Sequence, residues 1–231
     1  MKSTARDPQL TVDLGHPRDA SILGISKEDN GRPAQRLRSP RYTLLIRAAK
    51  LVTDHGEFIC VVRDVSETGV RLRLFHDPPT GEPIELHMVG GDVYSLRQVR
   101  QDGNEVGCEF IERIDLPRFL TEENAYPKRG LRLSLCFPIN IVSLSGLRDD
   151  GTIVNLSQQG ARFSCKGMYA IDQALRVECT EQEVGFGAVS AKVRWRRDSE
   201  YGVVFENTLS LEEFAKLAAK LQKPELLSAN P

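Results

Sequence analysis

An arginine and a polar turn that follows it recur in the sequence 91 residues further along the chain. Residues 64–69 read DVSETG and residues 155–160 read NLSQQG, so each turn has a polar first residue, a serine and a closing glycine. Arg41 and Arg132 precede these turns by the same distance. A chain of 231 residues is long enough for one large domain or for two of about 100 residues, and the repeat favours two.

Short strand-like runs fill both halves of the chain. Residues 70–75 alternate apolar with basic side chains at a period of two, which is typical of a strand with one buried face. The Asp-Gly pair at 102–103 and the Gly-Gly pair at 90–91 predict hairpin connections, and RDDG at 148–151 predicts a turn in the second half. The expected strands are 42–52, 70–75, 84–88, 93–99, 106–111, 131–144 and 160–165. The fold class is therefore mainly β, with a small antiparallel barrel or sandwich in each half.

Two helices are expected after these strands. Residues 114–123 have Asp115 as a cap and a proline in the first turn, and residues 210–221 begin with a capping box made by Ser210 and Glu213. Both repeats also end in the pattern Glu-x-Gly-x-x-Phe, each after a strand that contains Val-Arg. The expected organisation is a flexible tail (1–34), a first domain (35–121), a linker (122–127), a second domain (128–222) and a flexible C-terminal tail (223–231).

Charge and cysteine usage limit the possible partners. The net charge is -1, so the chain lacks the overall basic field of many nucleic-acid-binding proteins, and no DNA partner is expected. Basic residues do cluster locally, because residues 36–50 contain five of them and no acid. Five widely spaced cysteines indicate reduced, buried thiols, and no run is apolar enough for a membrane span, so a cytoplasmic location is expected. The four histidines have no ligand-like spacing, and neither a metal site nor an enzyme motif is expected.

The combination of motifs resembles the PilZ domain. An arginine arm, the glycine-closed turn, a later Val-Arg-Trp strand and a terminal helix follow one another in the order of that family, over residues 35–121 and 126–222. The resemblance implies two tandem six-stranded β-barrels, each followed by a short helix. It also implies a non-catalytic bacterial signalling protein that binds cyclic di-GMP and no other cofactor. Such a protein would act on motility, exopolysaccharide or surface attachment through a downstream protein partner.

The resemblance also identifies candidate ligand-binding residues in each repeat. In the first repeat they are Arg36, Arg38, Arg41, Asp64, Ser66 and Gly69; in the second they are Lys128, Arg129, Arg132, Asn155, Ser157 and Gly160. We expect the arginines to grip phosphates or guanine edges, and the first turn residue to accept hydrogen bonds from guanine. The serine would donate to phosphate or brace the turn, and the glycine would allow a positive φ and a close backbone approach.

The arms depart from the family pattern Arg-x-x-x-Arg. Leu37 stands at the first arginine position of repeat one, and Lys128 at that of repeat two. The alternative is therefore a PilZ-type interaction scaffold that binds no nucleotide, in which the arms are solvated linkers and the turns only connect strands. Trp195 is interpreted as a half-exposed barrel residue rather than a base-stacking surface. The partner, the oligomeric state and the stoichiometry stay open.

Overall fold

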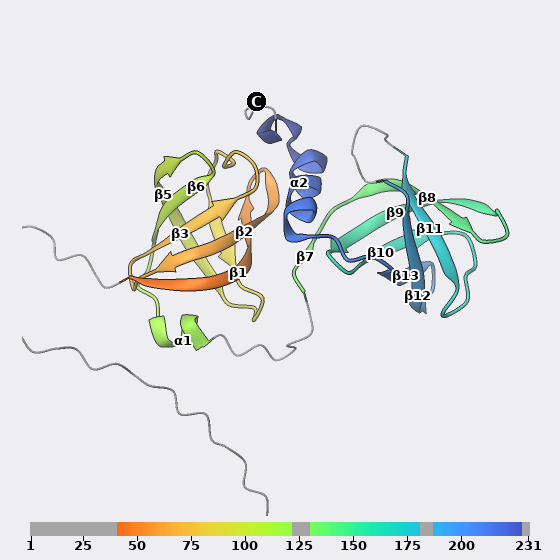
Figure 1. Ribbon diagram of the computed structural model, residues 1–231, viewed down its shortest axis with the longest axis horizontal. Coiled ribbons are helices and arrows are strands. Elements are labelled where there is room, and N and C mark those ends of the chain that lie inside the picture. Colours follow the sequence, from red (N-terminus) through yellow and green to blue (C-terminus); the bar gives the residue numbers. More distant parts are fainter. Residues whose placement is uncertain (1–40, 122–129, 181–186, 228–231) are drawn as a thin grey trace, which may run out of the picture. The chain divides into compact units, whose positions relative to one another are not determined.

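The first half of the chain forms a closed barrel of six antiparallel strands (Figure 1). The computed structural model describes residues 41–121, 130–180 and 187–227. The hydrogen-bonded order is β1-β2-β3-β6-β5-β4, and β1 pairs with β4 to close the barrel. The strands are β1 (Tyr42–Thr53), β2 (Gly56–Val65), β3 (Gly69–Leu74), β4 (Ile84–His87), β5 (Val93–Asp102) and β6 (Glu105–Phe110), and the helix α1 (Leu116–Thr121) follows them.

The second half repeats this topology. Six of its strands form a ring in the order β8-β9-β10-β13-β12-β11, and the pairing of β11 with β8 closes it. A short seventh strand, β7, pairs with β9. The strands are β7 (Arg132–Leu133), β8 (Phe137–Ser143), β9 (Arg148–Ser157), β10 (Gly160–Cys165), β11 (Ala174–Cys179), β12 (Val189–Arg197) and β13 (Glu200–Phe205). The expected fold class, two tandem antiparallel six-stranded barrels, is confirmed.

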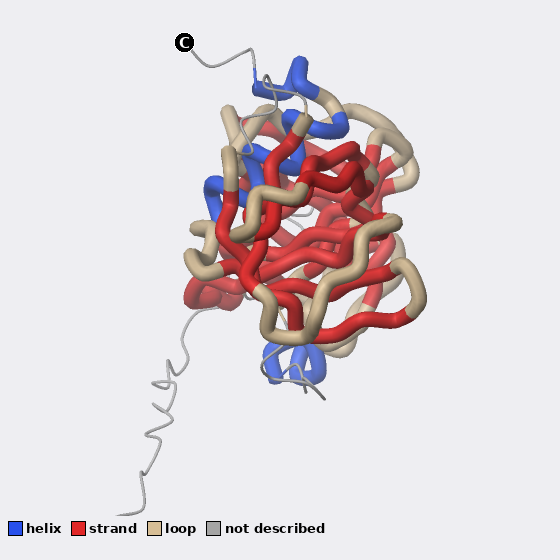
Figure 2. Tube along the Cα trace, turned by 90° about the vertical axis from the view of Figure 1, so that its right-hand side faces the viewer, coloured by secondary structure: helices blue, strands red, loops and turns tan. Residues whose placement is uncertain are grey.

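The register of the two barrels explains why the arginine and the turn are equally spaced in both halves of the chain. Tyr42 pairs with Val65 in the first barrel, and Leu133 pairs with Leu156 at the equivalent position of the second. β7 therefore corresponds to the beginning of the longer β1. Strands make up most of the described chain (Figure 2), and their inward-facing side chains form one hydrophobic core in each barrel.

The helix α2 (Leu211–Gln222) begins as the sequence predicts. Ser210 accepts a hydrogen bond from the backbone N–H of Glu213, and the Glu213 carboxylate accepts one from the backbone N–H of Ser210. Its Phe214, with neighbouring apolar residues, joins the second core, whereas its Ala219 joins the first. The side-chain amide of Gln222 also accepts a hydrogen bond from the backbone N–H of Glu57 and donates one to the Glu57 carbonyl, at 2.8 and 2.7 Å. The helix therefore packs on β2 of the first barrel as well as on the second barrel.

Two predictions from the sequence are wrong. Residues 148–151 do not form a turn but begin β9; the turn lies just before them, where the N–H of Gly146 donates to the Ser143 carbonyl. Crowding favours glycine at position 151 instead, because a Cβ there would lie 2.9 Å from the backbone carbonyl oxygen of Ser164 and 2.5 Å from Cδ1 of Ile141. The tail after residue 222 is also not loose throughout, since η2 (Pro224–Leu227) is a short 3-10 helix with a buried Leu226. The expected N-terminal tail, 1–34, lies outside the described residues.

The cysteines match the expectation in part. All five are free; Cys60, Cys108 and Cys165 are buried, whereas Cys136 is exposed and Cys179 is half-buried. Burial raises the pKa of Cys108 to about 12, so this thiol stays protonated at neutral pH. Within the described ranges, no helix combines the length and the hydropathy that a membrane span requires.

His76 is a buried titratable residue of the first barrel. It is 3% exposed and its ring lies 5.2 Å from that of Phe58. Because the Asp77 carbonyl, 2.7 Å away, only accepts, Nδ1 must be the donor. Nε2 then presents a lone pair that has no hydrogen-bond partner among the described residues. Burial lowers the pKa of His76, and the hydrogen bond to Asp77 opposes that shift.

The stability of the first barrel is therefore expected to depend on the protonation of His76. The unfolded chain takes up the proton at a higher pH than the folded chain, so the free energy of unfolding falls as the pH drops below about 6.5. In His76→Asn this slope is expected to flatten, whereas His55→Gln, a change at a turn residue, should retain it. Urea unfolding over that pH range measures the slope. An unchanged slope in His76→Asn would contradict the prediction.

Candidate nucleotide-binding pockets

The first barrel carries a pocket where the turn between β2 and β3 meets the start of β1. Its volume is about 630 Å³. The residues that matter most for its chemistry are Arg41, Asp64, Ser66, Gly69, Arg71 and Arg100. Four of the six expected residues of repeat one are therefore brought together here. The other two, Arg36 and Arg38, lie outside the described residues.

Asp64 is the electrostatic centre of this pocket. Its side chain is 7% exposed, and its Oδ1 accepts a hydrogen bond from Nη1 of Arg41 at 3.0 Å. Its Oδ2 accepts from Nε of Arg71 at 2.5 Å, and Arg71 also donates to Glu105 at 3.1 Å. The hydrogen bond with Asp64 raises the pKa of Arg71. Each carboxylate oxygen of Asp64 is thus engaged by an arginine, which fixes the guanidinium of Arg41 at the mouth of the pocket.

The turn between β2 and β3 is closed by Ser66 and Gly69. The backbone N–H of Ser66 donates to the Gly69 carbonyl at 2.8 Å, and the Gly69 N–H donates to Oγ of Ser66 at 3.2 Å. Ser66 therefore braces the turn. The expectation of a positive φ at Gly69 is wrong, because the described glycines with positive φ do not include it. Gly69 is needed for the close approach alone: a Cβ would lie 2.9 Å from the carbonyl oxygen of Cys108 on β6.

The second barrel has a pocket of about 400 Å³ at the equivalent place. Residues at its centre are Arg132, Asn155, Ser157, Gly160, Arg162 and Trp195. Oγ of Ser157 donates to the Gly160 carbonyl at 3.0 Å, so this serine also braces its turn. A Cβ on Gly160 would collide with the carbonyl oxygen of Val203, again without a positive φ. The expected residues Lys128 and Arg129 lie outside the described residues.

The glycine of each Glu-x-Gly-x-x-Phe pattern makes room for a pocket residue on the neighbouring strand. Gly107 pairs with Arg100, and a Cβ there would lie 2.8 Å from Cγ of Arg100. Gly202 pairs with Trp195, and a Cβ there would collide with the indole. Trp195 is 42% exposed, as expected of a half-exposed barrel residue, and it also lines the pocket. By this register Arg100 corresponds to Trp195. The two Val-Arg pairs of the sequence are therefore not equivalent, because Arg194 corresponds to Val99 and not to Arg100.

The described basic residues of segment 36–50 make different contacts in the structure. Nη1 of Arg47 donates to the carbonyl of Phe119 at 2.5 Å and Nη2 to that of Leu120 at 2.7 Å, so this arginine caps the C-terminal end of α1. Lys50 donates to Glu57 across the β1–β2 pair at 2.9 Å. Of the cluster's described residues, Arg41 is the one that lines the pocket.

Sequence reasoning missed Arg71 and Arg162. Each stands two residues after the glycine of its turn and lies directly opposite the turn's first residue, Asp64 or Asn155. The signal was available, because a hairpin that closes on the glycine places these two positions across from each other. Among the described residues, no group of three or more His, Cys, Asp or Glu side chains is arranged to hold a metal ion.

Comparisons with known proteins agree with this duplicated architecture. The family model for the PilZ domain matches residues 35–121 and 129–223. No curated protein matches the sequence. Among solved structures, the Borreliella burgdorferi PlzA protein in complex with c-di-GMP matches at 13% identity and a TM-score of 0.33, covering 77% of this chain and 88% of its own.

Two further solved structures have similar values. The Bacillus subtilis inhibitor of motility MotI/DgrA matches at 14% identity and a TM-score of 0.33, covering 79% of this chain and 98% of its own. Escherichia coli YcgR in complex with c-di-GMP matches at 10% identity and a TM-score of 0.31, covering 73% and 80%. The family assignment rests on the two domain matches, which together span most of the sequence. The chain therefore belongs to the PilZ domain family and contains two copies of that domain.

Proposed function

We propose that the chain is a non-catalytic bacterial signalling protein of the cytoplasm that binds cyclic di-GMP in its barrel pockets. The observation that carries the proposal is the duplicated pocket: an arm arginine, Arg41 or Arg132, lines the same cavity as a serine-braced, glycine-closed turn in both barrels. Membership of the PilZ family supports the choice of ligand.

The chemistry of these pockets suits a cyclic dinucleotide. Its phosphates are anions that a guanidinium grips through two parallel N–H donors, and its guanines offer N–H groups and acceptor atoms on their edges. Asn155 offers a carbonyl oxygen for a guanine N–H. Asp64 retains lone pairs beyond the two that its arginines engage, because an ionised carboxylate accepts about four hydrogen bonds. Gly69 and Gly160 line the pockets with backbone alone, because a side chain at either position would meet the neighbouring strand.

The remaining arm residues would complete each site when the ligand is bound. Arg36 and Arg38 precede Arg41 in the first repeat, and Lys128 and Arg129 precede Arg132 in the second. Residues 122–132 also connect the two domains, so contacts made there by the ligand would change how the domains are presented to a downstream protein partner. We place the regulated process among motility, exopolysaccharide production and surface attachment.

The alternative hypothesis is a PilZ scaffold that binds a partner protein but no nucleotide. Three observations favour it: Leu37 and Lys128 interrupt the arms, and Asp64 is already engaged by two arginines of its own barrel. Under that reading the first pocket is a structural ion-pair network and carries no ligand.

Titration calorimetry with cyclic di-GMP separates the two readings. We expect saturable binding to the full-length protein, and a roughly tenfold to hundredfold weaker affinity at the affected barrel in Arg41→Ala and in Arg132→Ala, because each change removes charge-assisted hydrogen bonds. Arg73→Ala is the control for the first barrel, since Arg73 lies two residues from Arg71 on β3 and does not line this pocket.

Arg176→Ala on β11 is the control for the second barrel, because Arg176 pairs with Glu178 away from the pocket. Both controls remove one positive charge and should bind as the wild type does. Absence of binding heat at any ligand concentration would refute the receptor and leave the scaffold.

A further inference from the structure

The two pockets differ in the charge of one residue. Asp64 in the first barrel corresponds to Asn155 in the second, and each lies across its hairpin from an arginine, Arg71 or Arg162. The first pair is joined by a 2.5 Å hydrogen bond. The difference in the second pair leaves a donor that this hairpin does not satisfy.

That donor is Nε of Arg162. It is buried, and it has no hydrogen-bond partner among the described residues, whereas the equivalent Nε of Arg71 donates to Asp64. Glu200 lies 3.6 Å from Nη1 of Arg162, which is an ion-pair distance beyond hydrogen-bond length. A buried unsatisfied donor is costly, so the guanidinium of Arg162 is held less firmly in its place than that of Arg71 and turns toward an anion without breaking a hydrogen bond to its hairpin.

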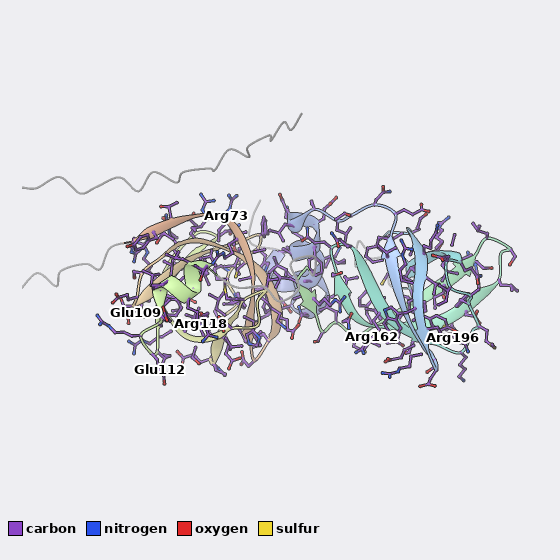
Figure 3. The ribbon with its side chains drawn as sticks, turned by 90° about the horizontal axis from the view of Figure 1, so that it is seen from below. Arg73, Glu109, Glu112, Arg118, Arg162 and Arg196 are labelled. Atoms are coloured by element: carbon purple, nitrogen blue, oxygen red, sulfur yellow. The ribbon has the colours of Figure 1, made fainter. Side chains whose placement is uncertain are left out.

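The linings of the two pockets show the same contrast in net charge. The second pocket is lined by three arginines, Arg132, Arg162 and Arg194, and by no acid; Arg162 and Arg194 pair with Glu200 and Asp172, which lie outside the lining. The first is lined by Arg41, Arg71 and Arg100 together with the acids Asp64 and Glu109, which leaves one net positive charge against three. Figure 3 labels Glu109 on the first barrel and Arg162 on the second. An anion entering the first pocket must compete with Asp64 for Arg41 and Arg71, two of the three arginines there.

The second pocket also has a flat aromatic surface that the first does not. Trp195 occupies the position that Arg100 holds in the first barrel, and it rests on Gly202, where a Cβ would collide with it. The indole is half-exposed and lines the pocket. An indole held in this way can stack on a purine, and stacking is tolerant of the exact base position.

We propose that the second barrel holds the tighter nucleotide site, where the guanidinium of Arg162 contacts the ligand and Trp195 stacks on a guanine. This proposal rests on the proposed cyclic di-GMP binding. It adds that the second pocket fills first, and that Arg162 and Trp195, which belong neither to the turn nor to the arm, are the reason. The order follows from the charges, because Asp64 already engages Arg41 and Arg71, two of the first pocket's three arginines.

The chain offers a site-specific probe, since Trp195 is its single tryptophan. Cyclic di-GMP is titrated into the full-length protein while tryptophan fluorescence reports the second pocket and calorimetry reports both. In the wild type we expect the fluorescence change to saturate with the first, tighter binding event. Arg162→Ala should raise the dissociation constant obtained from fluorescence at least tenfold. Arg71→Ala, the matched change in the first barrel, should leave that constant unchanged.

A reciprocal substitution tests the charge argument without removing an arginine. Asn155→Asp places a carboxylate opposite Arg162, as Asp64 lies opposite Arg71, at nearly constant size. We expect it to weaken the fluorescence-detected binding about tenfold, because the ligand must then displace the new partner. Circular dichroism of each variant confirms that its barrels are folded, and Asn155→Asp serves as the decisive test if Arg162→Ala does not fold.

The outcomes separate this proposal from the proposed function. Binding heat with no change in tryptophan fluorescence, or equal fluorescence-derived constants in the wild type, Arg162→Ala and Asn155→Asp, overturns the assignment to the second pocket and leaves cyclic di-GMP binding intact. Neither heat nor a fluorescence change in the wild type overturns both.

Discussion

Gly160→Ala is expected to lower the free energy of unfolding by about 3 kcal/mol, the upper part of the usual range for overpacking. Gly160 begins β10 and pairs with Val204 on β13. A Cβ there would collide with the Val203 carbonyl oxygen and would lie 3.1 Å from its carbon and 3.2 Å from Cα of Val204. Because these atoms belong to the paired backbone, relief requires the two strands to separate.

The equivalent change in the first barrel should cost less. At Gly69 a Cβ would lie 2.9 Å from the Cys108 carbonyl oxygen, which a small shift relieves, so we expect Gly69→Ala to cost about 1 kcal/mol. Gly187→Ala is the control, because a Cβ there meets nothing within 4 Å. Urea unfolding followed by circular dichroism and by Trp195 fluorescence measures all three. A Gly160→Ala protein as stable as Gly187→Ala would show that the strands separate at little cost.

Phe214→Ala is expected to lower the free energy of unfolding of the second barrel by about 3–5 kcal/mol, the usual cost of removing a fully buried phenylalanine. Phe214 lies in the first turn of α2 and is 0% exposed within the core of that barrel. A capping box fixes the start of the helix, so the helix has little freedom to move into the space that the ring leaves.

The same helix supplies the control for this prediction. Lys216 is exposed and pairs with Glu212 one turn away, so Lys216→Ala should cost about 0.2–0.5 kcal/mol. Because Trp195 belongs to the second barrel, its fluorescence during urea unfolding follows the unit that Phe214 stabilises. If Phe214→Ala and Lys216→Ala unfold at the same urea concentration, α2 does not contribute to the stability of that barrel.

Asp-Gly pairs in the sequence predicted a turn correctly only where the packing around them allows one. The Asp-Gly pair at 102–103 does connect β5 to β6, and Gly103 has a positive φ there. The Asp-Gly pair at 150–151 is inside β9, because Gly151 faces Ile141 and Ser164 where no side chain fits. The dipeptide is the same in both places. The packing around it decides whether the chain turns.

The sequence predicted how the arm and the turn of each candidate site are spaced, but it did not identify all of the charged residues there. The equal spacing in the two halves pairs Arg41 with Asp64 and Arg132 with Asn155, and each pair lines one pocket. The partners on the opposite strands were not identified, because Arg71 and Arg162 are ordinary outward-facing residues of an alternating strand when they are considered alone.

The sequence by itself determined the duplication, the β class and the position of each glycine-closed turn, since these depend on residues close together in the chain. Only the tertiary structure decided how the charges are shared. Asp64 meets Arg71 through a hairpin and Arg41 across the β1–β2 pair, whereas Asn155 leaves Nε of Arg162 without a partner. Trp195 faces its pocket because Gly202, on a neighbouring strand, leaves room for the indole. Such contacts depend on which strands lie side by side, and strand pairing is a property of the closed barrel.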